Sequence, residues 1–304
     1  MAMAEATGPA ARPVAIPGAR AVDFTSAISG RPYRLLIHVP DTPAPATGHP
    51  LLVILDGNLY FAGAVDSARL QGRHFITPPV ILAVGYQTDD LAAQLTLRMR
   101  DLTPWIARET RQSPAYLLAA GGRPLEDAEV GGLDDFLDMI EREAIPIVRD
   151  LARIDASRMV LFGHSLGGRA ALHALFGRPP VYAGLVASAP SIWWDGASIQ
   201  AAERDFRAAP RTAPPPKLLL AVGALEEEPP RTLRPAPLPE AQVRAMLASI
   251  RMVGHVVDMG VRLAAVPGYG PDRLHTVVFP EEDHVSVVPA VLSRALRFMF
   301  GRAG

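Results

Sequence analysis

The chain has 304 residues, of which 49% are hydrophobic and 20% are charged, a composition typical of a globular protein with a sizeable core. Its 30 basic and 31 acidic side chains nearly cancel, so no overall field favours binding to nucleic acid or to an anionic membrane surface. It contains no cysteine, which excludes disulfide bonds, thiolate metal sites and a cysteine nucleophile.

The first twenty residues contain neither a basic start nor an unbroken apolar stretch, so they do not resemble a secretory signal. No apolar run in the chain approaches the ~20 residues that span a bilayer. We therefore expect a soluble cytoplasmic protein with a flexible segment over residues 1–20. A periplasmic location is the alternative if a leader has been removed.

Short apolar runs predict strands along most of the chain. Two come first, at 21–28 and 31–40, and Gly30 between them favours a hairpin. The later runs are continuous and rich in branched residues, as in strands that are covered on both faces of a parallel sheet. They lie at 51–57, 79–86, 159–163, 184–190, 218–224 and 275–280.

Helical periodicity falls between these runs. Phe136, Ile140 and Ile147 are spaced as on one face of a helix over 133–151, although Pro146 is expected to kink or end it. Three more helices are predicted at 167–177, 239–265 and 288–300.

Strands that alternate with helices predict an α/β fold, a doubly wound and mostly parallel sheet with helices on both faces. We expect one such domain over residues 21–304. The Gly- and Pro-rich stretch at 103–132 has no clear period and is long for a plain connection, so it predicts a lid or a substrate loop.

The stretch "GHSLG" at 163–167 follows a predicted strand and precedes a predicted helix, which is the context of a nucleophile elbow. In such a turn Ser165 would be the nucleophile, and side chains two positions to either side of it would collide with their neighbours. The N–H of Leu166 would open the next helix and could donate to an oxyanion. A glycine-rich helix entry without chemistry is the alternative.

A serine hydroxyl needs a base to take its proton. In the α/β-hydrolase arrangement the acid and then the histidine follow the serine along the chain. Most of the eight histidines precede the serine or fall in or beside predicted strands and helices, and His164 in the turn is expected to point away from Ser165. His284 lies in a loop just after the last predicted strand and is the predicted base, with an ordinary surface histidine as the alternative.

The acid is expected after the strand that precedes the last one, where Glu226, Glu227 and Glu228 follow one another. Such a carboxylate fixes the tautomer of the imidazole and stabilises its cation. At most one of the three can face His284. We take Glu226 as the predicted acid and Glu227 as the alternative, and we interpret Asp283 as a loop-capping carboxylate.

The second oxyanion donor is expected in the loop after an earlier central strand. The stretch "ILDGNLYF" at 54–61 ends a strand at Asp56 and Gly57 and places Asn58 at the turn, so the Asn58 backbone N–H is the candidate. An Asp-Gly pair alone indicates only a turn. The sequence has no Walker loop, G-x-G-x-x-G or H-E-x-x-H motif, which excludes nucleotide-binding and zinc-protease interpretations.

Together these blocks resemble the esterase family of α/β-hydrolases that includes ferric-enterobactin esterases, feruloyl esterases, S-formylglutathione hydrolase and the mycolyltransferases. The resemblance runs from about residue 21 to 300. Two blocks, "PSIWW" and "DHVSVVPA", are most similar to the branch that acts on the catecholate siderophores enterobactin, salmochelin and bacillibactin. The other matching blocks are "LLVILDGN", "RDLTP", "LFGHSLGGRAALHALF", "VGALEEE" and "EEDHVSVVPAVLSRALRF".

The resemblance implies a serine esterase that opens the tri-lactone backbone of a catecholate siderophore for iron release, with Ser165 and His284 as catalytic residues. By similarity to the mycolyltransferases it implies Asn58 and Leu166 as oxyanion donors. Some members of the siderophore branch function with a Ser-His dyad, so the resemblance leaves open whether catalysis requires the acid. No metal or organic cofactor is implied, because iron would arrive inside the substrate.

Siderophore tri-esters carry aromatic catecholates that are anionic when iron is bound, so the implied pocket needs aromatic or cationic surfaces. Trp193 and Trp194 follow the strand after the elbow helix, at the sheet edge where α/β proteins bind ligands. Arg98 and Arg100 could contact catecholate oxygens through charge-assisted hydrogen bonds. Core packing of the tryptophans and solvated arginines are the alternatives.

Two other functions stay open from the sequence. The first is a general carboxylesterase, such as a feruloyl esterase or S-formylglutathione hydrolase, because the elbow describes the chemistry and not the leaving group. The second is a hydrolase-like protein that binds a small-molecule ligand without turning it over. The sequence gives no indication of the oligomeric state.

Overall fold

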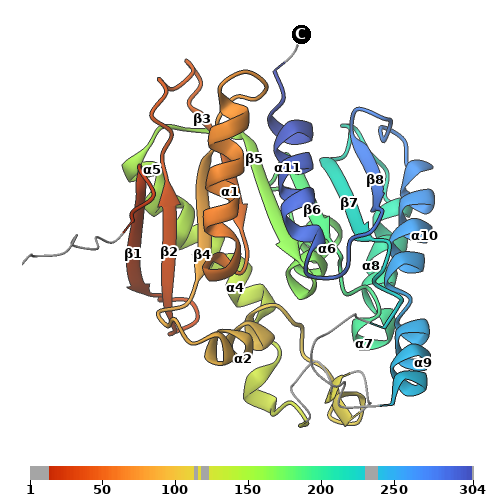
Figure 1. The fold of residues 1–304 in the computed structure, drawn as a ribbon. Coiled ribbons are helices and arrows are strands. Elements are labelled where there is room, and N and C mark those ends of the chain that lie inside the picture. Colours follow the sequence, from red (N-terminus) through yellow and green to blue (C-terminus); the bar gives the residue numbers. More distant parts are fainter. Residues whose placement is uncertain (1–13, 113–115, 118–122, 230–238, 303–304) are drawn as a thin grey trace, which may run out of the picture.

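The computed structural model describes residues 14–112, 116–117, 123–229 and 239–302, and it centres on an eight-stranded sheet in the order β1-β2-β4-β3-β5-β6-β7-β8 (Figure 1). The first two strands, β1 (Ala19–Thr25) and β2 (Pro32–His38), form the predicted antiparallel hairpin. Since β1 begins at residue 19, the predicted flexible segment overlaps this strand, and residues 1–13 lie outside the described part. The remaining strands are parallel to one another, and only β2 joins them antiparallel.

The central strands are covered on both faces. Every residue of three of them is buried, as their continuous apolar runs predict. The last strand in the order is different, because its residues alternate between half-buried and exposed. The parallel strands are β3 (His49–Ile54), β4 (Val80–Gly85), β5 (Ile154–His164), β6 (Gly184–Ser188), β7 (Lys217–Gly223) and β8 (Leu274–Phe279).

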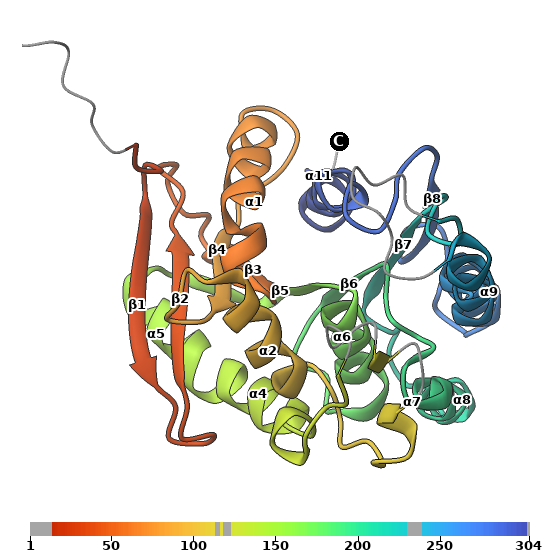
Figure 2. The same ribbon diagram turned by 60° about the horizontal axis from the view of Figure 1, so that its bottom comes forward.

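Helices cover the two faces of the sheet, which confirms the predicted α/β fold class. On one face lie α1 (Gly57–Gly72) and α11 (Val287–Phe300), which pack on each other (Figure 2). The opposite face is covered by α4 (Leu133–Met139), α5 (Ile145–Leu151), α6 (Leu166–Gly177) and α8 (Ile199–Ala208). The other α-helices are α2 (Leu91–Asp101), α7 (Trp194–Ala197), α9 (Glu240–Ile250) and α10 (Met252–Ala264), and α10 packs on β7 and β8.

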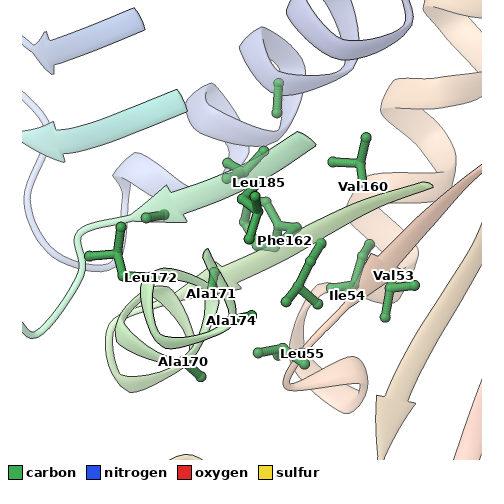
Figure 3. Packing of buried hydrophobic residues seen from close by; sticks show 14 of the residues in the cluster. Val53, Ile54, Leu55, Val160, Phe162, Ala170, Ala171, Leu172, Ala174 and Leu185 are labelled. Carbon is green, nitrogen blue, oxygen red and sulfur yellow. The ribbon is translucent and has the colours of Figure 1, made fainter. Parts of the chain in front are cut away.

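The turn between β5 and α6 joins two largely buried elements. Phe162 of β5 faces the other side of the sheet, where its ring contacts Tyr60 of α1, while Leu185 of β6 and the α6 residues Ala170 and Ala171 are buried (Figure 3). Side chains this small allow the helix to approach the sheet closely. The turn between β5 and α6 is therefore held between two packed elements, and this turn carries Ser165.

Two predicted helices have a different internal structure. The helix over 133–151 does not end at Pro146. Instead, Ile140–Ala144 form a π-helical segment in which the N–H of Ile145 donates to the carbonyl of Ile140. This wider turn just before the proline accommodates its ring and its missing donor. The helix predicted over 239–265 is two helices, which are separated at Arg251 by a left-handed backbone (φ 49°, ψ 49°).

Candidate functional site

The elbow adopts the strand–turn–helix geometry that its motif predicts. Ser165 lies between β5 and α6 with φ 60° and ψ −118°, a strained backbone for a residue with a side chain. A Cβ on Gly163 would come within 1.9 Å of the carbonyl oxygen of Gly167, and one on Gly168 within 2.7 Å of that of Ser188. These close approaches explain why glycines surround the serine.

Three sequence-distant side chains meet at this turn. The Ser165 Oγ lies 3.0 Å from His284 Nε2, and His284 Nδ1 lies 2.6 Å from Glu226 Oε2. Ser165 follows β5, Glu226 follows β7 and His284 follows β8. Parallel strands place their carboxyl ends at one edge of the sheet (Figure 1), and the three loops therefore converge there.

The carboxylate of Glu226 is fixed from two sides. Its side chain is 1% exposed, and its second oxygen, Oε1, accepts the backbone N–H of Gly223 at 2.7 Å. A carboxylate at Nδ1 favours the tautomer with a proton on that nitrogen, so the lone pair of Nε2 faces the Ser165 hydroxyl. This arrangement can transfer a proton from serine to imidazole and stabilise the resulting cation.

The neighbouring acids are used elsewhere. Glu227, the alternative to Glu226, accepts the N–H of Gly254 at the start of α10. Asp283 accepts the N–H groups of Val285 and Ser286, each at 2.8 Å, as expected for a loop-capping carboxylate. These backbone N–H groups lower the pKa of Asp283. Of the three consecutive glutamates, the structure thus brings Glu226 to the histidine.

His164 lies closer to the site than the sequence analysis expects. Its ring packs against the His284 ring with centroids 4.7 Å apart, and its Nδ1 lies 3.0 Å from Ser188 Oγ. Burial, assisted by the neighbouring His284, holds the pKa of His164 well below its usual value. His164 is therefore neutral at pH 7 and adds no positive charge beside His284. The side chain of Ser191 is a further neighbour, with its Oγ 3.4 Å from that of Ser165.

Both predicted oxyanion donors lie at helix N-termini. Leu166 is the first residue of α6 and Asn58 is the second of α1, where backbone N–H groups have no acceptor within the helix. The side chain of Asn58 is occupied, because Oδ1 accepts the N–H of Tyr86 at 2.7 Å and Nδ2 donates to the carbonyls of Tyr86 and Thr88. The assignment of the two N–H groups as oxyanion donors stays a prediction.

The two tryptophans predicted to contact substrate differ in how far they are buried. Trp194 is 1% exposed and packs against Tyr116 at 4.3 Å between ring centroids, which is the core packing that the alternative interpretation expects. Trp193 is half-buried and is the N-cap residue of α7, two residues after Ser191. Tyr116 contacts both tryptophans, and no sequence pattern predicts this contact, because Tyr116 lies among the irregular residues 103–132.

The two arginines are also held within the protein. Arg98 is buried and pairs with Asp56 through two hydrogen bonds, so the structure gives it a protein partner in place of the predicted substrate. Arg100 is half-buried, and its Nη1 lies 3.8 Å from Asp101. In the sequence Asp56 indicates only a turn, and this pairing has no local signal because it joins residues 42 positions apart.

The stretch at 103–132, predicted to be a lid or substrate loop, is described only in part. It contains two 3₁₀ turns, at Thr110–Gln112 and Asp127–Glu129, while residues 113–115 and 118–122 lie outside the described part. Within this stretch, Arg111 is 1% exposed and its side chain donates to the carbonyls of Ile106 and Leu125. The role of residues 103–132 as a lid or a substrate loop stays a prediction.

Among the residues that the structure describes, no helix combines the length and the apolar character needed to cross a bilayer. Within the same ranges, no group of three or more His, Asp or Glu side chains could hold a metal ion.

Comparisons with known proteins place the chain among esterases. A family model described as "Putative esterase" matches residues 26–257. Ferri-bacillibactin esterase BesA of Bacillus subtilis is 31% identical over 289 residues, which cover 93% of this chain and 90% of that protein. Siderophore triacetylfusarinine C esterase of Aspergillus fumigatus is 31% identical over 284 residues, 89% of each chain. The solved structure of siderophore hydrolase EstA from Aspergillus nidulans is 28% identical, covers 96% of this chain and 98% of that one, and superposes with a TM-score of 0.78.

Proposed function

Because the chain belongs to this esterase family and is a serine hydrolase with the α/β-hydrolase fold, we propose that it hydrolyses the tri-lactone of a catecholate siderophore and so releases iron. The observation that carries the proposal is the chain of hydrogen bonds from Ser165 through His284 to Glu226. The similarity to a ferri-bacillibactin esterase over most of both chains supports the substrate class.

The proposed reaction begins with proton transfer from Ser165 Oγ to His284 Nε2, as the serine oxygen attacks an ester carbonyl. The carbonyl oxygen becomes an oxyanion, which the backbone N–H groups of Asn58 and Leu166 bind. Glu226 stabilises the imidazolium that forms in this step. Collapse of the intermediate breaks the ester C–O bond, and the proton on His284 goes to the departing alcohol oxygen.

Water then completes the cycle. His284 takes a proton from a water molecule, whose oxygen attacks the acyl group on Ser165, and the same N–H groups bind the second oxyanion. The serine oxygen leaves and regains its proton from His284, which releases the carboxylic acid. In a tri-lactone each such cycle opens one ester. On the substrate side, Trp193 and Arg100 remain the proposed contacts, and residues 103–132 the proposed lid.

The test is a comparison of substrates with a matched inactive variant. We expect kcat/KM for ferric enterobactin and ferric bacillibactin to exceed that for p-nitrophenyl acetate, S-formylglutathione and a feruloyl ester. Triacetylfusarinine C and the iron-free siderophores complete the panel. The variant Ser165→Ala should lose turnover and fluorophosphonate labelling together, because the attacking oxygen is gone.

Other outcomes would identify the alternatives. A preference of more than tenfold for a short ester would replace the siderophore assignment with a general carboxylesterase. An unreactive Ser165, with siderophore bound but intact, would indicate a binding protein that does not turn its ligand over.

A further inference from the structure

The ion pair between Arg98 and Asp56 lies beside the elbow and has no part in the proposed proton transfer. Arg98 Nε lies 2.6 Å from Asp56 Oδ1, and Nη2 lies 2.9 Å from Oδ2. The side chains are 11% and 2% exposed. Although burial alone would lower it, the carboxylate of Asp56 raises the pKa of Arg98 above its usual value. A forked and buried pair of this kind holds both partners in one geometry.

Asp56 occupies a position at which an aspartate side chain usually caps the helix. It is the N-cap residue of α1, and the side chain of an aspartate there normally accepts the N–H of the second or third helical residue. In this helix the second residue is Asn58, the proposed oxyanion donor. Yet Asp56 makes no side-chain cap, because its carboxylate turns to Arg98 instead.

Asp56 lies in a tight turn between β3 and α1. Asp56 has a left-handed backbone (φ 57°, ψ 48°), and a Cβ on the next residue, Gly57, would come within 2.7 Å of the backbone of β4. One carboxylate oxygen lies 3.3 Å from the position that a Cβ on Gly167 would take, so the group is wedged between α1 and the elbow. Because Asp56 is the N-cap residue, a carboxylate released from Arg98 is next to the first turn of α1, where an N-cap side chain ordinarily accepts an N–H.

We propose that Arg98 is a positioning residue that holds the Asp56 carboxylate away from the Asn58 N–H, and thereby keeps this donor free for the oxyanion. The inference rests on the proposed function, because the oxyanion forms only during ester hydrolysis. An anion that capped Asn58 would occupy the donor and repel the developing negative charge. Arg98 thus acts on the reaction through Asp56 and touches no reacting atom.

The first test removes only the arginine. In Arg98→Met the released carboxylate caps the Asn58 N–H, so kcat for p-nitrophenyl acetate should fall about 10²-fold, as for the loss of one oxyanion donor. KM should change less than threefold, because a donor used mainly in the transition state contributes little to substrate binding.

The second test removes the carboxylate as well. In Asp56→Gly/Arg98→Met nothing remains to cap Asn58, and glycine accommodates the left-handed backbone and is tolerated at an N-cap. We expect kcat to recover at least tenfold over Arg98→Met. A double variant no faster than Arg98→Met would overturn the inference, because it would assign the loss to general damage to the loop.

A matched ion pair controls for stability. Arg262 forks onto Glu203 at 2.8 and 2.6 Å, and the Glu203 side chain is 1% exposed, but this pair joins α8 and α10 away from the elbow. Arg262→Met should lower the unfolding temperature about as much as Arg98→Met and leave kcat within threefold of the wild type. Equal losses of kcat in both variants would contradict a positioning role.

A structural readout separates this inference from the proposed function. A crystal structure of Arg98→Met should place an Asp56 carboxylate oxygen within hydrogen-bond distance of the Asn58 nitrogen. A carboxylate that stays away from Asn58 would overturn the inference even in an active esterase. A wild type that hydrolyses no ester would contradict the proposed function. The crystal structure of Arg98→Met would still show whether the Asp56 carboxylate moves to the Asn58 nitrogen.

Discussion

Glu226 makes a contact through each of its two carboxylate oxygens, and this double contact makes the site sensitive to a change of one atom. Oε1 accepts the N–H of Gly223 and Oε2 faces His284 Nδ1. In Glu226→Gln the amide oxygen would keep the bond to Gly223, so the NH₂ group would face His284. Nδ1 of His284 would then accept a hydrogen bond from this group, and the ring proton would move to Nε2. A protonated Nε2 cannot accept the proton of the Ser165 hydroxyl.

We therefore expect Glu226→Gln to lower kcat on the order of 10²- to 10⁴-fold, with the protein still folded. Glu227→Gln is the control. Its side chain accepts the N–H of Gly254, and a glutamine oxygen can do the same, so kcat should stay within threefold of the wild type. Steady-state kinetics with one short ester suffice. Wild-type activity in Glu226→Gln would mean that Ser165 and His284 work as a dyad.

At single positions, the sequence predicts the residues that a motif marks and misses those that depend on three-dimensional contacts. Ser165 has a motif, and His284 has a place in the order of elements. The choice among the consecutive glutamates depends on the direction of each side chain after β7, which no spacing encodes. Asp56 looks like a turn residue in the sequence, because its partner Arg98 is on a helix that begins 35 residues later.

Among the elements, the strands were predictable and several helices were not. The buried strands stand out as continuous apolar runs. Helix α2 has the reverse of the expected pattern, since Leu91 and Leu95 are about half exposed while Gln94, Arg98 and Asp101 are buried. An amphipathic search places the polar face of such a helix in solvent and so fails. The buried polar face is where α2 contacts Asp56, and a local departure of this kind is common at functional sites.

Strand β8 is the element on which the proposed base depends, and it pairs with a neighbour on one side only. All of its residues are partly or fully exposed, whereas β3 and β4 are buried throughout. Edge elements with little buried surface open at a lower free energy than the core. Opening of β8 would displace His284 from Ser165 without unfolding the sheet.

Activity should therefore be lost at a lower urea concentration than secondary structure. The measurement compares the midpoint for ester hydrolysis with the midpoint for far-ultraviolet circular dichroism in the same samples. Recovery of activity on rapid dilution would exclude irreversible damage. Coincident midpoints would show that β8 opens only when the whole molecule unfolds.

For the whole molecule, the sheet order explains how one chain assembles this site. Ser165 and His284 are 119 residues apart in the sequence, and Glu226 lies between them. Their strands β5, β7 and β8 run parallel in one sheet, so each following loop emerges at the same edge. Alternation of strands and helices predicts such a sheet from the sequence. The order of strands within it and the side-chain contacts at its edge arise from tertiary packing, which the local pattern does not contain.

The stability of the whole molecule should carry the signature of one buried acid. Asp101 is 1% exposed, and burial raises its pKa from 3.8 to about 6, against the opposing charge of Arg31. The folded state therefore binds this proton more tightly than the unfolded state. Stability is lost as pH rises from about 4 to 6, and the cost is complete above that range.

Asp101→Asn removes this cost, so it should raise the free energy of unfolding at pH 7.5 by about 2 kcal/mol relative to its effect at pH 4. Urea unfolding at the two pH values measures the difference. Asp135→Asn, at an exposed position, controls for the loss of one carboxylate. An equal effect of Asp101→Asn at both pH values would contradict the ionisation of Asp101 as the cause.

The contact between Gly163 and Gly167 also limits how this protein can diversify. No side chain fits at Gly163, because the carbonyl of Gly167 already occupies the space. Descendants of this sequence can therefore change their substrate specificity only through the loops around the elbow, such as the one that carries Trp193. A laboratory library aimed at new substrates should likewise leave residues 163–168 untouched and vary those loops.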